Sequence, residues 1–71
     1  MSSTMIFEKL ERSNKMFEFE GTKEDNIMDV TLWKWSNKTK SYNQVYIKHL
    51  WKSDAREVYR QLKESGYHKT T

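Results

Sequence analysis

The chain has 71 residues, enough for one small domain (1–71) that buries only a modest fraction of its surface. It has no cysteine, which excludes disulfides and thiolate metal sites, and no apolar run of membrane-spanning length or signal-peptide character. Its net charge is +3, but residues 1–32 hold four Lys/Arg against seven Asp/Glu, whereas residues 33–71 hold nine against three. We therefore expect a soluble cytoplasmic protein whose basic half is either a nucleic-acid footprint or an ordinary solvated surface.

The N-terminal third of the sequence favours antiparallel strands. Residues 5–11 precede a turn-forming segment, 12–15, and we interpret them as a strand, with a short helix as the alternative. After the turn, Phe17 and Phe19 alternate with polar residues, which is a strand pattern of period two. The loop at residues 21–26 sets the register with the next strand, and the predicted pairs are Gly21–Asn26, Phe19–Met28, Phe17–Val30 and Glu18–Asp29.

A long β-hairpin over residues 27–50 is the central element of the prediction. Two runs rich in β-branched and aromatic residues, 27–35 and 42–50, flank a polar hexapeptide. With Ser36 opposite Ser41, favourable cross-strand pairs fall in register, and such pairs stabilise by roughly 0.2–1 kcal/mol each. The predicted pairs are Val30–Ile47, Leu32–Val45, Trp35–Tyr42 and Asp29–Lys48. A shift of one residue would move every side chain to the other face of the sheet.

This register assigns the hairpin side chains to two faces. The aliphatic face is the predicted core face; it carries Met28, Val30, Leu32, Val45 and Ile47, with His49 on the same parity. The other face mixes aromatic and polar side chains; it carries Thr31, Trp33, Trp35, Tyr42, Gln44, Tyr46 and Lys48. Together with the helix described next, the register predicts one contiguous core made of Val30, Leu32, Val45, Ile47, Val58 and Leu62.

A C-terminal helix over about residues 53–65 follows the hairpin. Asp54 or Ser53 is the expected N-cap, with Glu57 completing a capping box. Gly66 suits the residue after the helix, where a left-handed conformation is common. The apolar stripe has helical spacing and consists of Ala55, Val58, Tyr59 and Leu62. The predicted fold is α+β: a three- or four-stranded antiparallel sheet with this helix on its aliphatic face, and residues 1–4 and 68–71 frayed.

The sequence has no signature of catalysis or of a cofactor. It has neither a glycine-rich phosphate loop nor a nucleophile elbow. The two histidines, His49 and His68, are far apart in the chain, so a structural or surface role is expected for each rather than a catalytic or metal-binding one. We therefore expect a non-enzymatic protein without a metal or cofactor.

Aromatic and basic residues of the hairpin are the main functional signal. Aromatic rings can stack on bases, and lysines can neutralise phosphates, so our first hypothesis is a small regulatory protein that binds DNA or RNA. Stacking or groove contacts would come from Trp33, Trp35, Tyr42 and Tyr46. Phosphate contacts would come from Lys34, Lys38, Lys40 and Lys48.

The alternative hypothesis is a protein–protein adaptor or inhibitor that uses the same aromatic face. Tryptophan and tyrosine are enriched at protein interfaces, and the acidic residues Glu18, Glu20 and Asp29 on this face repel phosphate. An exposed apolar face also needs a cover, which is either residues 5–11 or a second copy of the chain in a homodimer. We expect no membrane partner.

Overall fold

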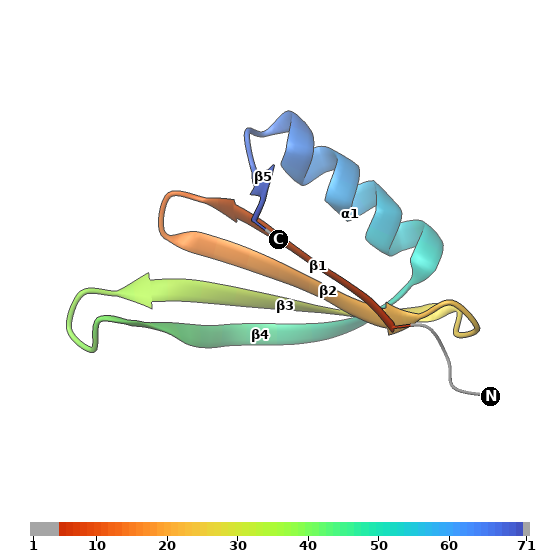
Figure 1. The fold of residues 1–71 in the computed structure, drawn as a ribbon, viewed down its shortest axis with the longest axis horizontal. Helices are drawn as coiled ribbons and strands as arrows, with labels where there is room; N and C mark the ends of the chain where they lie inside the picture. Colours follow the sequence, from red (N-terminus) through yellow and green to blue (C-terminus); the bar gives the residue numbers. More distant parts are fainter. Residues whose placement is uncertain (1–4, 71) are drawn as a thin grey trace.

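The computed structural model describes the backbone of residues 5–70 and the side chains from Phe7 onward (Figure 1). Its elements are β1 (Met5–Arg12), β2 (Lys15–Thr22), β3 (Ile27–Ser36), β4 (Ser41–Trp51), α1 (Lys52–Glu64) and β5 (His68–Lys69). The strands form one antiparallel sheet in the order β4-β3-β2-β1-β5, and α1 lies against one of its faces. The predicted α+β class is confirmed, with five strands rather than three or four.

The N-terminal segment belongs to the sheet. β1 pairs with β2 along its whole length, from Met5 opposite Thr22 to Arg12 opposite Lys15. The tight connection between them is possible because Ser13 adopts a left-handed conformation, with φ of 55°. The strand interpretation of residues 5–11 is therefore confirmed, and this segment does not fold over the aromatic residues of β3.

The pairing of β2 with β3 differs from the prediction by two residues. Gly21 lies opposite Met28, Phe19 opposite Val30 and Phe17 opposite Leu32. The predicted partners were wrong, because the loop between the strands is residues 23–26 and the turn is therefore centred one residue later in the chain than predicted. Both phenylalanines nevertheless lie on the face that packs against α1, since side chains alternate with a period of two and a shift of two preserves the face.

A β-bulge interrupts the pairing of β3 with β4. The pairs Ser36–Ser41 and Trp35–Tyr42 are confirmed, but Trp33 then faces Gln44 while Leu32 faces Tyr46, which leaves Val45 without a partner. Beyond the bulge the register is shifted by one, so the predicted pairs there are wrong. The observed pairs are Thr31–Ile47, Val30–Lys48, Asp29–His49, Met28–Leu50 and Ile27–Trp51.

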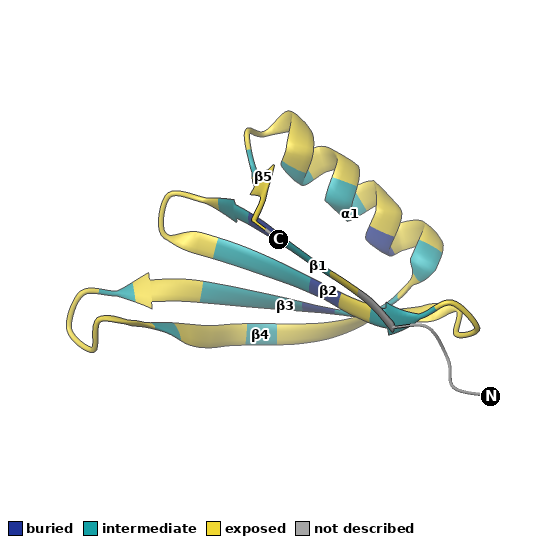
Figure 2. Cartoon of the chain, in the orientation of Figure 1, coloured by how far each residue is buried: buried dark blue, intermediate teal, exposed yellow. Residues whose placement is uncertain are grey.

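The bulge also corrects the predicted core. Val45 and Ile47 are 52% and 47% exposed, so neither is a core residue. His49, predicted on the core-face parity, lies opposite Asp29 on the other face. The buried core consists of Leu10, Phe19, Val30 and Ala55, and the half-buried Val58 and Leu62 of α1 pack against it (Figure 2).

Helix α1 begins one residue earlier than predicted. Trp51 is its N-cap residue and makes no side-chain capping bond, so the expected capping box of Asp54 with Glu57 is wrong. The first turn is held instead by the Lys52 amide, which donates to the Asn26 carbonyl at 2.7 Å. Asn26 is far from Lys52 in the sequence, so this contact at the start of the helix is tertiary and no local capping motif predicts it.

The C-terminal end of α1 follows the predicted pattern. Gly66 has φ of +97°, its amide donates to the Lys63 carbonyl, and the Tyr67 amide donates to the Leu62 carbonyl at 3.0 Å, which is a Schellman motif. The chain then turns back along β1. His68 and Lys69, expected to be frayed, pair with Glu11 and Leu10 as β5, while residues 1–4 and 71 lie outside the described residues.

Candidate binding surfaces of the sheet

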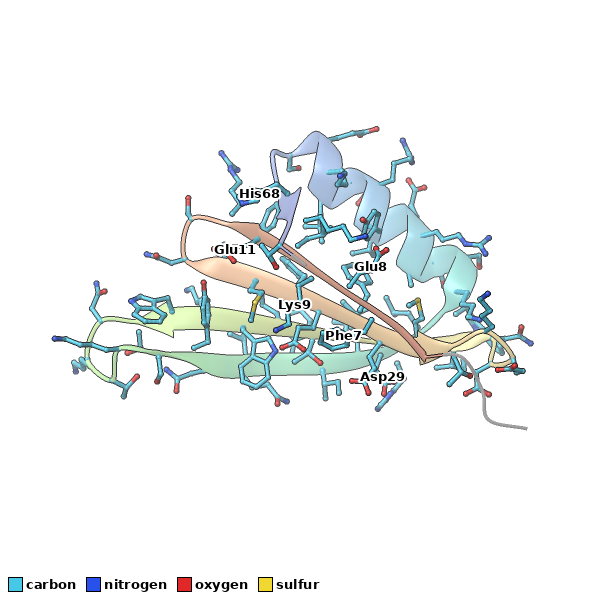
Figure 3. The ribbon with its side chains drawn as sticks, in the orientation of Figure 1. Phe7, Glu8, Lys9, Glu11, Asp29 and His68 are labelled. Atoms are coloured by element: carbon cyan, nitrogen blue, oxygen red, sulfur yellow. The ribbon has the colours of Figure 1, made fainter. Side chains whose placement is uncertain are left out.

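The strand registers define two faces of the sheet. Paired residues of antiparallel strands point to the same side, so the buried Leu10, Phe19 and Val30 identify the face toward α1, here called the helix-side face. The opposite face is called the outer face. In Figure 3, Glu8 lies between β1 and α1, whereas Phe7, Lys9 and Asp29 lie on the other side of the strands. This division determines which side chains can act together.

The predicted binding residues do not form one surface. Trp33, Trp35 and Tyr42 lie on the outer face. Tyr46 and Lys48 follow the bulge and therefore lie on the helix-side face, together with Lys34. Lys38 and Lys40 lie in the turn between β3 and β4, where Lys40 has a φ of 52°.

Charge is segregated between the two faces. Among the described strand residues, the outer face carries four carboxylates and one lysine: Glu11, Glu18, Glu20, Asp29 and Lys9. The helix-side face carries five cations and one carboxylate: Arg12, Lys15, Lys34, Lys48, Lys69 and Glu8. An anionic ligand is therefore repelled by the outer face and attracted by the helix-side face.

Large apolar side chains are exposed on the outer face. Six such residues in the described chain are exposed: Phe7, Ile27, Trp35, Val45, Ile47 and Trp51. Five of them lie on the outer face by register, and the sixth, Val45, is the unpaired residue of the bulge. Trp51 is the most open, at 60% exposure. No described element covers this face, because α1 and its connections lie on the other side (Figure 1).

The end of the outer face next to the β3–β4 turn is held together by aromatic contacts. Trp35 and Tyr42 meet edge to face with ring centroids 5.2 Å apart, and the Trp35 indole donates to the Asn37 side chain at 3.1 Å. Trp33 is half-buried, and its indole Nε1 is buried without a partner in the described residues. A buried donor without a partner is unusual, so the hydrogen-bonding capacity of the Trp33 indole is not satisfied by the described residues.

The end of the outer face near the β2–β3 loop has an acidic cluster. Glu20 lies opposite Asp29, a like-charge pair that is unfavourable in a sheet. Asp29 contacts His49 on its other flank, with 2.5 Å between the Asp29 Oδ1 and the His49 Nδ1. The predicted partner was Lys48, which the bulge moves to the helix-side face.

A row of cations crosses the helix-side face near the hairpin turns. Arg12 lies opposite Lys15, and Lys15 lies opposite Lys34. None of the three forms an ion pair with another residue that the structure describes. On the neighbouring strand, the Lys48 ammonium lies 4.8 Å from the centre of the Tyr46 ring, which is a cation–π contact.

Sequence reasoning missed residues on both faces. Ile47 was assigned to the core because nothing in the alternation of β4 marks the bulge. Ile27 and Trp51 were left without a role because they lie at the strand ends. Lys15 and Arg12 were read only as turn residues, although adjacency to a tight turn does indicate that they lie opposite each other.

Other site classes receive no support from the described residues. They contain no group of three or more His, Cys, Asp or Glu residues that could hold a metal ion. The helix described here is too short and too polar to cross a membrane. No protein-family model, curated protein or solved structure matches this chain.

Proposed function

We propose that this protein is a non-enzymatic protein-binding module, an adaptor or inhibitor, and that its outer face is the contact surface. The observation that carries the proposal is that five of the six exposed large apolar side chains of the described residues lie on that face. Several large apolar side chains exposed on one face of a small domain are typical of a protein-interaction site. Trp35 and Trp51 are the natural anchors, because tryptophan is enriched among the residues that dominate binding energy.

Charge favours a basic partner. The carboxylates of the outer face would repel nucleic acid, and they would complement lysine or arginine residues around an apolar centre. They also disfavour a homodimer in which two outer faces pack together, because Glu18, Glu20 and Asp29 of one copy would approach the same residues of the other. The partner is thus expected to be a different protein.

The test is affinity capture of partners from source-cell lysate, with and without nuclease, by the wild-type chain and by the variant Ile47→Ser/Trp51→Ser. Both side chains are about half exposed or more, so the variant removes apolar contact area with little loss of core packing. We expect partners that the wild type retains after nuclease treatment and that the variant loses. The control is Lys63→Ser, on α1, which should retain the same partners.

Equal capture by the wild type and the double variant would contradict this proposal, provided that far-UV circular dichroism shows both to be folded. Loss of all captured protein on nuclease treatment would also contradict it. That second outcome would favour the other candidate function.

The second candidate is a nucleic-acid-binding regulator that uses the helix-side face. The row of Arg12, Lys15 and Lys34 supports it, since adjacent cations without acidic partners are suited to phosphate contacts. The protruding β3–β4 hairpin (Figure 1) adds Lys38 and Lys40 in its turn. In this proposal Tyr46 supplies base stacking, whereas Trp33, Trp35 and Tyr42 on the opposite face do not contact the same nucleic acid.

Fluorescence anisotropy with single- and double-stranded DNA and RNA probes at low salt tests this second function. Lys15→Gln and Lys34→Gln should each weaken binding of all probes and lower the salt slope by about one unit. Tyr46→Ala should lose roughly 1–3 kcal/mol, the usual contribution of one stacked base. Lys9→Gln, on the outer face, is the control and should change little; equal effects at Lys9 and Lys15 would contradict the assignment of the face.

A further inference from the structure

A cleft of about 480 Å³ lies between the N-terminal half of α1 and the sheet. Its volume is within the range typical of small-molecule sites, which is roughly 300–1,000 Å³. Glu8 of β1 is part of its lining, and among the described residues β5 pairs with β1 only at Leu10 and Glu11. The cleft belongs to neither the apolar outer face nor the cation row near the hairpin turns.

The floor of the cleft is apolar. Phe19 and Ala55, which are 2% and 1% exposed, form part of it together with Met28. Tyr59 forms one wall and packs edge-on against Phe19, with ring centroids 5.4 Å apart. Such a floor favours a hydrocarbon chain or ring over a polar group.

Three cations surround the cleft: Lys23, Lys52 and Arg56. The Lys52 ammonium donates to the Lys23 carbonyl at 3.0 Å, which holds it beside the loop that follows β2. No carboxylate forms an ion pair with any of the three among the residues described. Their charge therefore remains available to an anion.

The one carboxylate of the cleft is already engaged. Glu8 contacts the Lys69 ammonium at 3.4 Å and also interacts with Tyr59. Burial, followed by the hydrogen-bonding and charge interactions with Glu8, raises the pKa of Tyr59 above its ordinary value. Glu8 thus offsets little of the positive charge on the opposite rim.

We propose that the cleft binds a small amphipathic anion, whose carboxylate or phosphate head lies among Lys23, Lys52 and Arg56 and whose apolar chain lies on Phe19, Met28 and Ala55. Cations without a carboxylate partner among the described residues, beside an apolar floor, are complementary to this class of molecule. The inference is independent of the proposed protein-binding function, because it uses the opposite face of the sheet.

The probes are decanoate and decyl phosphate below their micellar concentrations, measured by isothermal titration calorimetry and by amide shifts in nuclear magnetic resonance. We expect one site per chain, with shifts around Met28, Ala55 and Tyr59. Decanol lacks the charge and butyrate lacks the chain, and each should bind at least about tenfold more weakly. Equal binding of decanol, no binding of either anion, or shifts centred on Ile47 and Trp51 would overturn the proposal.

Arg56→Gln is the decisive variant, because it removes one cation from an exposed helix position and should keep the fold. We expect it to weaken decanoate binding by about five- to tenfold. Lys63→Gln, on the same helix but outside the lining of the cleft, is the matched control and should bind as the wild type does. Equal loss in the two variants would overturn the proposal, since it would indicate only a general charge effect.

Vesicles of phosphatidylglycerol in phosphatidylcholine distinguish a membrane lipid from a free ligand. Co-sedimentation that Arg56→Gln lowers supports the site with a lipid as its ligand. Decanoate binding without co-sedimentation supports the site with a free anion. Co-sedimentation that Arg56→Gln leaves unchanged, together with no decanoate binding, would place the interaction elsewhere and refute the proposal.

Discussion

Val30 and Val45 allow the same chemical change to be made in two environments on neighbouring strands. Both are valines that the alternation pattern assigns to the core, yet Val30 is 2% exposed and Val45 is 52% exposed. Truncation to alanine removes the equivalent of two methylene groups, or about 1.6 kcal/mol of transfer free energy at a fully buried site. A residual cavity brings the expected loss at Val30 to about 2–3 kcal/mol. At Val45, half of the transfer energy and no cavity give less than about 1 kcal/mol.

Urea unfolding followed by far-UV circular dichroism measures both losses. A chain of this length is expected to have a total stability of about 4–10 kcal/mol, so Val30→Ala should shift the midpoint strongly while leaving a cooperative transition. The lower β-propensity of alanine affects both variants, so the difference between them is the diagnostic quantity. Equal destabilisation, or a larger loss at Val45, would refute the bulge and restore the continuous register.

Three further predictions concern stability. Gly66→Ala should cost about 1 kcal/mol in a thermal or urea melt, because φ of +97° is strained for any residue with a Cβ; an unchanged melt would contradict the Schellman motif. The raised pKa of Tyr59 means that its contribution is present below about pH 10 and is lost as pH rises through the folded-state pKa. Unfolding free energy should therefore fall more steeply from pH 9 to 11 in the wild type than in Tyr59→Phe, and parallel curves would show that the phenol beside Glu8 is not responsible. Glu20→Lys should stabilise the chain by roughly 0.2–1 kcal/mol, because it replaces the like-charge pair of Glu20 with Asp29 by an opposite-charge pair. An unchanged or lower midpoint of urea unfolding would contradict this prediction.

Side-chain alternation predicted faces more reliably than partners. The β2–β3 register was wrong by two residues, yet Phe17 and Phe19 were assigned to the correct face, because a shift of two leaves parity unchanged. Sequence alone could not fix the partners, since residues 21–26 can form turns of several lengths and each length sets a different register. The helix was recognisable from its apolar stripe, and its end from Gly66, because both signals are local.

Tertiary contacts explain what the sequence did not reveal. The start of α1 depends on a hydrogen bond from Lys52 to Asn26, and no local pattern encodes such a contact. β5 is too short to show any periodicity, and it is held by pairing with Leu10 and Glu11 of β1. The cleft beside α1 combines residues from β1, β2, β3 and the helix, so its cations could be assembled only after the topology was known.

The bulge at Val45 determines how the predicted binding residues are divided between the two faces of the sheet. With a continuous register, Lys48 would lie beside Asp29 on the acidic face, and Ile47 would lie over the core. One extra residue in β4 reverses both placements, which exposes Ile47 and Trp51 on the outer face and turns Tyr46 and Lys48 toward the cations of the other face. The bulge therefore adds exposed apolar side chains to the outer face and one lysine to the helix-side face. The bulge is therefore the reason that Tyr46 and Lys48 lie on the opposite face of the sheet from Trp33, Trp35 and Tyr42.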